Sequence, residues 1–177
     1  MEKFFQDEEP SSLQIDFTKA IWATDQLNKI FHNAGMFILK DVDFVAETET
    51  EIIFVECKNS NRVDAENAEA FNPKSDKHIN GVAQKYYDSL SFLKFTDKNL
   101  HKKKIFCYII ESKSGDSVLR NFLRTRIANL LPFKLQRQEI LPCTTMIDEF
   151  FVLSFAEWNK KFPQFPLTRL TDAICQN

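Results

Sequence analysis

The stretch Lys40–Asn59, KDVDFVAETETEIIFVECKN, decides the architecture that we expect for this chain. Two apolar runs, Val42–Ala46 and Ile52–Cys57, flank the acidic segment Glu47–Glu51. Both runs are rich in β-branched and aromatic residues, which favour strands, so the stretch is predicted to form a β-hairpin. If the turn is centred between residues 49 and 50, each residue i lies opposite residue 99 − i.

This hairpin would bring two carboxylates together. Its register places Asp43 directly across from Glu56, and the Cβ atoms of opposed residues lie roughly 5 Å apart. Lys58 shares the strand face of Glu56, whereas Cys57 points to the opposite face and is expected to pack in the core. Asp41 competes with Asp43 because both lie on one face, but Asp41 would face Lys58 and could pair with it. The residue types at this end of the hairpin are those of a divalent-metal site.

The arrangement Asp43…Glu56-Cys57-Lys58 resembles the D…(D/E)-x-K core of the PD-(D/E)xK nuclease superfamily, over about residues 13–111. The resemblance implies an α/β (α+β) fold of the restriction-endonuclease-like kind, a mixed β-sheet flanked by helices. It implies a nuclease that hydrolyses phosphodiester bonds of DNA or RNA with Mg²⁺ or Mn²⁺. The metal ligands would be Asp43, Glu56 and the backbone carbonyl of Cys57. Lys58 would orient or activate the attacking water.

The resemblance also implies two weaker catalytic candidates. Apolar periodicity predicts a helix from about Ile15 to Phe31, and Asp25, the acid in its middle, would join the metal site; an exposed helical aspartate is the alternative. A second helix, about Lys77–Phe95, would present a glutamine or lysine toward the cleft, and Gln84 and Lys85 are both available. We carry over Gln84, although Asp88 stands where a Gln-x-x-x-Tyr variant has tyrosine. Val42 stands where the family name has proline.

A second acid-x-lysine match shows how little this pattern means alone. Glu111-Ser112-Lys113 also ends an apolar run, Ile105–Ile110, but no acid precedes it in a hairpin partner. We therefore treat it as a decoy. His78, near the start of the second predicted helix, is expected to have a capping or surface role.

The net charge of the chain is −2, but its basic and acidic residues are distributed unevenly along the sequence. Residues 1–93 carry 9 basic and 17 acidic side chains, whereas residues 94–137 carry 11 basic and 3 acidic ones. Such a basic segment can hold a phosphate backbone without reading its sequence, although a solvated helix face is the usual alternative. The candidate nucleic-acid-binding residues are Lys102, Lys103, Lys104, Arg120, Arg124 and Arg126.

Length and composition bound the remaining expectations. The chain has 177 residues and is 44% hydrophobic, which suits a flexible arm over residues 1–12 and a single domain over 13–177, with a C-terminal elaboration from residue 112. Three glycines and no phosphate-loop pattern argue against nucleotide-binding loops of the Gly-rich kind. Four dispersed cysteines suggest reduced thiols in the cytoplasm, and no apolar run is long enough to span a membrane.

We expect nucleic acid, with DNA first, as the partner, and a homodimer stays open. The alternative function is a catalytically inactive nuclease-like fold that binds nucleic acid or a protein, with the charged cluster serving as a structural ion pair.

Overall fold

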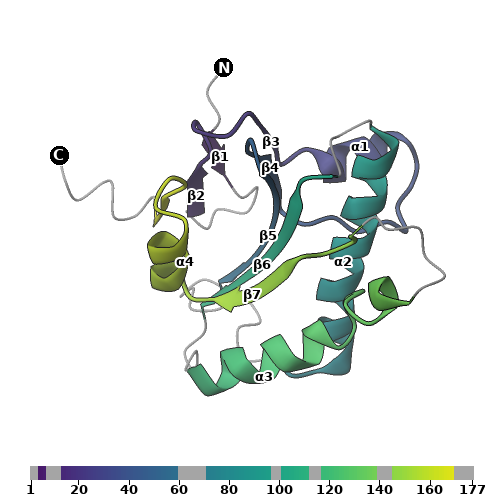
Figure 1. Cartoon of the computed structure of the whole chain (residues 1–177), viewed down its shortest axis with the longest axis vertical. Helices are drawn as coiled ribbons and strands as arrows, with labels where there is room; N and C mark the ends of the chain where they lie inside the picture. Colours follow the sequence, from purple (N-terminus) through teal and green to yellow (C-terminus); the bar gives the residue numbers. More distant parts are fainter. Residues whose placement is uncertain are drawn as a thin grey trace.

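The computed structural model describes residues 4–6, 13–59, 71–96, 101–111, 117–138 and 145–169, which form a mixed α/β fold (Figure 1). The strands are β1 (Phe4–Gln6), β2 (Leu13–Asp16), β3 (Trp22–Thr24), β4 (Phe44–Glu47), β5 (Glu51–Asn59), β6 (Lys103–Glu111), β7 (Glu149–Leu153) and β8 (Leu167–Arg169). The α-helices are α1 (Leu27–Asn33), α2 (Asp76–Phe95), α3 (Ser117–Ala128) and α4 (Phe155–Lys161), and a 3₁₀ turn covers Leu135–Arg137.

The central sheet has five strands in the order β3-β4-β5-β6-β7. Strands β3, β4 and β5 pair antiparallel, and β5, β6 and β7 pair parallel. The apolar runs of β5 and β6 are almost continuous because both faces of these strands are covered, which is typical of parallel strands. The predicted fold class is therefore confirmed at the level of a mixed sheet flanked by helices.

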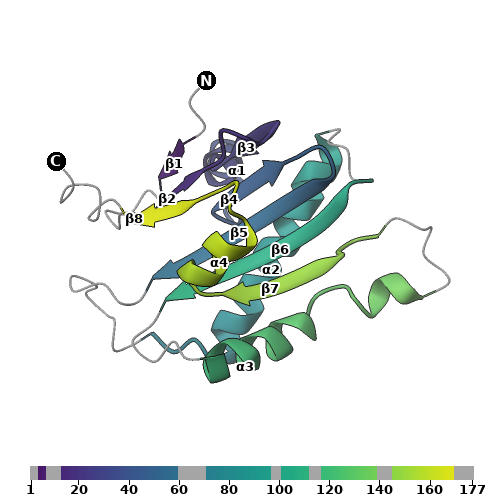
Figure 2. The same cartoon turned by 60° about the vertical axis from the view of Figure 1, so that its left-hand side comes forward.

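Two separate cores lie on the two faces of this sheet, and Figure 2 shows the elements that cover each face. Helices α2 and α3 cover one face, where Phe54, Phe106 and Tyr108 point. Helix α4 and the small sheet β1-β2-β8 cover the other face, where Val55 and Cys107 point. Alternation along β5 therefore decides which residues reach the α2 side, and Glu56 is among them because it lies two residues beyond Phe54.

Helix α2 is the element that completes the site. Ser75 caps its start by accepting a hydrogen bond from the amide of His78. Its buried stripe contains Ile79, Val82, Tyr86 and Leu90, as the apolar period predicts, and the helix packs across β5 and β6. The ring of Tyr86 stacks on that of Phe106, with centroids 5.0 Å apart, which holds the rotation of the helix about its axis.

Two predictions about the N-terminal part are wrong. The predicted helix over residues 15–31 is instead β2, β3 and the short helix α1, because the apolar spacing that suggested a helix also serves two short strands. The predicted arm over residues 1–12 is not loose at residues 4–6, which form β1 and pair with β2. β2 also pairs with β8 from the far end of the chain.

The apolar run Ile105–Ile110 lies within β6. Residues 60–70, which follow β5 in the chain, lie outside the described residues. Among the helices that the structure describes, none is long and apolar enough to cross a bilayer.

Candidate active site at the end of the central hairpin

The predicted register of the hairpin is confirmed. Phe44 pairs with Val55, and the pairs continue to Glu47 with Ile52, so the two numbers always add up to 99. One step beyond the paired residues, the same register sets Asp43 opposite Glu56. The hydroxyl of Thr48 accepts hydrogen bonds from the amides of Thr50 and Glu51, which closes the turn at the other end.

Lys85 from α2 joins the two carboxylates. Its Nζ donates to both Oε1 and Oε2 of Glu56 at 2.8 Å, and lies 3.7 Å from Oδ1 of Asp43. The Glu56 side chain is 8% exposed, whereas those of Asp43 and Lys85 are 25% and 29% exposed. The structure therefore places a nearly buried carboxylate and a half-buried one around one ammonium group.

Asp43 is oriented by the backbone of the opposite strand. The amide of Cys57 donates to Oδ2 of Asp43 at 2.6 Å, which turns this carboxylate toward β5. Cys57 itself packs in the core on the far face, as predicted. Asp41, the competitor of Asp43, accepts a hydrogen bond from Nδ2 of Asn28 at 3.2 Å. Asp43 is therefore the aspartate that shares Lys85 with Glu56.

Burial gives Glu56 an unusual proton affinity. Burial, followed by the nearby Asp43 carboxylate, raises the pKa of Glu56 to about 8, although Lys85 partly opposes this shift. Burial alone would lower the pKa of Lys85, but the Glu56 and Asp43 carboxylates outweigh it and raise that pKa. Lys85 thus stays charged near neutral pH, whereas Glu56 is poised to hold or lose a proton.

His78 and Tyr108 are site residues that sequence reasoning missed. Tyr108 is the partner of Glu56 on β6, and its hydroxyl lies 2.8 Å from Nε2 of His78. Burial, followed by the charges of Lys58 and Lys85, lowers the pKa of His78 to about 4. The only available signal was helical spacing, since residues 78, 81 and 85 lie on one face of α2.

A pocket of about 430 Å³ opens beside these groups. Its lining residues come from the segment before β4, from β5, and from α2 with the turn that precedes it: Lys40, Glu56, Phe71, Asn72, Ser75, Lys77, His78, Gly81, Val82 and Lys85. The carboxyl ends of parallel β5 and β6 lie at this edge, which is where α/β sheets usually bind ligands. Glu56 thus faces a hollow lined by three lysines.

Lys58 is exposed and lies at the rim of this group rather than between the carboxylates. Its Nζ lies 5.5 Å from the centroid of the Phe71 ring, and its charge reaches His78. The ammonium group at hydrogen-bond distance from Glu56 comes from α2, at Lys85.

The two weaker catalytic candidates lie elsewhere. Asp25 does not lie within a helix but between β3 and α1, where its carboxylate accepts a hydrogen bond from Nε2 of Gln26. Gln84 donates to Oδ2 of Asp88 at 3.3 Å. One residue along a helix is a rotation of about 100°, so Lys85 takes the position facing Glu56 that we had assigned to Gln84.

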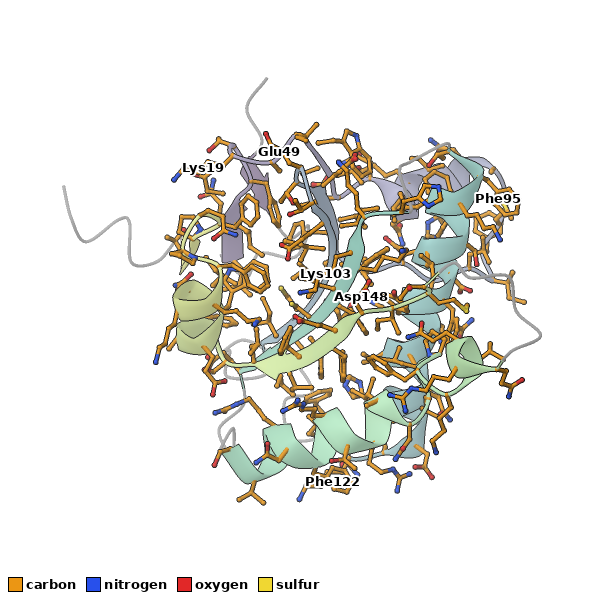
Figure 3. The ribbon with its side chains drawn as sticks, in the orientation of Figure 1. Lys19, Glu49, Phe95, Lys103, Phe122 and Asp148 are labelled. Carbon is orange, nitrogen blue, oxygen red and sulfur yellow. The ribbon has the colours of Figure 1, made fainter. Side chains whose placement is uncertain are left out.

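The three candidate lysines, Lys102, Lys103 and Lys104, lie at the opposite end of the sheet from Glu56. Lys102 forms an ion pair with Glu47 at 2.8 Å, and Lys103 forms one with Glu149 at 2.9 Å. Figure 3 labels Lys103 and the neighbouring Asp148. Lys104 is only 2% exposed, and its Nζ donates to the carbonyl of Lys102. Lys104 therefore does not present its charge to a polynucleotide, which corrects that prediction.

The three arginines lie on α3. Arg120 pairs with Glu157 at 3.0 Å, and Arg126 pairs with Asp76 at 2.6 Å. Arg124 is exposed and lines a second hollow with Asp148 and Glu149. Local acids thus already neutralise two of the three candidate arginines.

Glu111, the acid of the decoy motif, forms a hydrogen bond with the backbone. Oε1 of Glu111 accepts a hydrogen bond from the amide of Phe155 at the start of α4. Lys113 lies outside the described residues.

Comparison of the chain with models of protein families, with curated proteins and with solved structures finds no match.

Proposed function

We propose that this chain is a metal-dependent nuclease that hydrolyses phosphodiester bonds of DNA or RNA. The observation that carries the proposal is the convergence of Asp43 and Glu56 on Lys85 beside an open, lysine-lined pocket. The order of β4, β5, α2 and parallel β6 supports the restriction-endonuclease-like arrangement that the D…E-x-K resemblance implies.

The donor atoms suit Mg²⁺ or Mn²⁺. Asp43 and Glu56 supply carboxylate oxygens, and Mg²⁺ commonly uses one or two carboxylates and completes its shell with water and substrate phosphate. A site with two carboxylates is the relevant case here, because the described residues contain no group of three or more His, Cys, Asp or Glu side chains that could hold a metal. The carbonyl of Cys57 stays the predicted third protein ligand. When bound, the ion would polarise the phosphate and lower the pKa of its water.

The side chains of the site have separable roles in this proposal. The amide of Cys57 holds Asp43 in position, so this carboxylate needs no rearrangement to bind a cation. Glu56 must lose its proton to bind a metal, and its raised pKa makes that step depend on pH near neutrality. Lys58, exposed at the rim, orients the attacking water or neutralises the charge that develops on the phosphate.

Lys85 is a further catalytic candidate. Its ammonium group stabilises the carboxylate of Asp43, and that of Glu56 once Glu56 has lost its proton, and it would move toward the substrate phosphate when a metal ion takes over that task. A lysine acts here as a compact charge with three rotatable donors, which suits such a change of partner.

The binding-only alternative has one observation in its favour. Lys85 already forms a two-oxygen ion pair with Glu56, as a purely structural site would. In that function the chain binds nucleic acid or a protein, and the cluster only holds α2 on the hairpin.

A metal titration followed by a cleavage assay separates the two functions. We expect Mg²⁺ or Mn²⁺ to raise the unfolding temperature of the wild type and to leave that of Asp43→Asn unchanged. Plasmid DNA, single-stranded DNA and RNA are then incubated with the wild type and with Glu56→Gln. Metal-dependent cleavage by the wild type alone supports the nuclease. A wild type that neither responds to metal nor cleaves any of these substrates would leave the binding-only function.

The location of the ion can be tested directly in a crystal soaked in Mn²⁺. The proposal expects anomalous density within bonding distance of Asp43 and Glu56. If the crystallised protein is active and the anomalous density lies only at other acidic residues, the assignment of the active site to Asp43 and Glu56 would be wrong.

A further inference from the structure

We propose that the pocket beside the carboxylates binds one unpaired nucleotide of a single-stranded nucleic acid, with the base against Phe71 and the phosphate toward Lys40 and Lys77. This inference rests on the proposed function only for its link to cleavage. Its binding part can be tested without a metal ion.

The charge of the pocket suits an anion. Lys40, Lys77 and Lys85 line it, and Glu56 is the one acid among the lining residues. Lys85 is engaged with that acid, which leaves the two exposed lysines facing the opening. The amide of Lys40 donates to Asp88, which anchors the backbone of this residue to α2. Positive groups held around a hollow attract phosphate without reading sequence.

The back of the pocket is aromatic. The rings of Phe71 and His78 meet edge to face, with centroids 5.0 Å apart and planes at 90°. His78 is held in turn by the hydroxyl of Tyr108. Aromatic side chains stack on any base, because every base has a π face, so such a wall binds nucleotides without sequence preference. A fixed aromatic edge next to lysines is thus a surface for a nucleotide, rather than for a simple anion.

Gly81 gives an independent reason to expect a ligand. It lies in the middle of α2 and lines the pocket, although glycine is disfavoured in a helix interior relative to alanine. The packing of the chain does not require it, since an added Cβ would meet only Nζ of Lys40, at an ordinary 3.9 Å. The missing side chain therefore leaves room on the pocket wall, where Lys77 and Lys85 flank it at helical spacing.

The size of the pocket favours an unpaired nucleotide. Its volume of about 430 Å³ falls in the range of small-molecule sites. A base inside a duplex is covered by its neighbours and by its pairing partner, so its face cannot reach Phe71. A base in a single strand can be splayed out and stacked on an aromatic side chain.

Fluorescence anisotropy in EDTA tests the binding. The probes are labelled ten-nucleotide single strands of DNA and RNA, a blunt duplex of the same sequence, and inorganic polyphosphate. We expect at least tenfold tighter binding of a single strand than of the duplex or of polyphosphate. Equal affinity for single strand and duplex, or for polyphosphate and single strand, would overturn the proposal.

Substitutions locate the site. Phe71→Leu keeps an apolar side chain on the core and removes the aromatic face, so single-strand affinity should fall at least about fivefold. Lys77→Gln should weaken binding and reduce the log–log salt slope by about one. Lys94→Gln, at the far end of the same helix and outside the pocket, is the matched control and should leave both quantities unchanged. Unchanged affinity in Phe71→Leu and Lys77→Gln would refute the site.

Gly81→Ala separates binding from folding. It should raise the unfolding temperature by about 2 °C and weaken single-strand binding at least threefold. Asn80→Ala, exposed on the same helix, should raise the unfolding temperature without changing affinity. A Gly81→Ala protein that binds as tightly as the wild type shows that the pocket wall is not used.

The two proposals fail in different ways. A protein that binds single strands in EDTA, with the expected response to Gly81→Ala, and cleaves nothing with Mg²⁺ or Mn²⁺ keeps the pocket and loses the nuclease. A protein that cleaves with metal but binds single strand and duplex equally keeps the nuclease and loses the pocket.

Discussion

Replacing Glu56 by glutamine should remove a pH dependence of stability that the wild type shows above pH 6.5. In the folded chain Glu56 keeps its proton up to about pH 8, whereas an unfolded chain releases it near 4.5. Unfolding therefore releases a proton between these values, and the free energy of unfolding falls as pH rises through that window. Glutamine cannot ionise and keeps an oxygen that can accept from Lys85.

The magnitude follows from the width of the window. His78 acts in the opposite direction, because its folded pKa of about 4 lies below the ordinary 6.5, so its contribution to stability grows as pH rises between these values. Above pH 6.5 the opposing contribution of His78 fades, and the slope from Glu56 dominates. From pH 6.5 to 8, Glu56 should cost the wild type about 1.5 kcal/mol, because the full slope of 1.36 kcal/mol for each pH unit falls by half as Glu56 titrates at about pH 8.

Urea unfolding, followed by circular dichroism at four pH values from 6.5 to 8, measures this loss. Glu149→Gln at the other end of the sheet is the control, and it should keep the slope of the wild type. Parallel stability curves for wild type and Glu56→Gln would show that Glu56 is already ionised in the fold. The assignment of a raised pKa to this carboxyl would then be refuted.

Four other outcomes are expected. Lys58→Ala should leave metal binding intact and abolish most cleavage, whereas Lys113→Ala in the decoy should leave the cleavage rate unchanged; comparable losses would mean that the wrong motif was chosen. Apparent Mg²⁺ affinity, measured by calorimetry, should rise close to tenfold per pH unit below pH 8, because a proton must leave Glu56. Lys104→Met should be neutral or stabilise the fold by about 1 kcal/mol in urea unfolding, since burial lowers the pKa of this lysine. Arg126→Gln should leave the salt slope of nucleic-acid binding unchanged, because Asp76 already pairs with this arginine.

The hairpin could be predicted from sequence because its information is local. The turn and both apolar runs lie within twenty residues, and a slip of one residue would have sent the side chains of each core to the opposite face of the sheet. The same locality predicted α2, whose Ser75 cap and apolar stripe are adjacent in the chain. The pairing of Asp43 with Glu56 follows from that register alone.

The rest of the site could not be predicted from the sequence, because it depends on contacts between segments that are distant in the chain. Choosing Lys85 over Gln84 requires the rotation of α2 about its axis, which is held by Phe106 on a strand that comes later in the chain. The ion pairs of the basic segment could not be predicted for the same reason, since the acids that pair with Lys102 and Lys103 come from other strands. The failed helix over residues 15–31 contains β2, whose partner β8 lies some 150 residues away.

The pairing of β2 with β8 also sets the order in which the protein can fold during synthesis. Leu13 lies opposite Arg169, so β2 must wait for its partner until β8 has left the ribosome. Trp158, Phe165 and Leu167 belong to the same core as β2, and that face of the central sheet stays uncovered until they arrive. The α2 face, built from residues up to 152, can form before it. The nascent chain therefore acquires its candidate catalytic face first and its covered reverse side last.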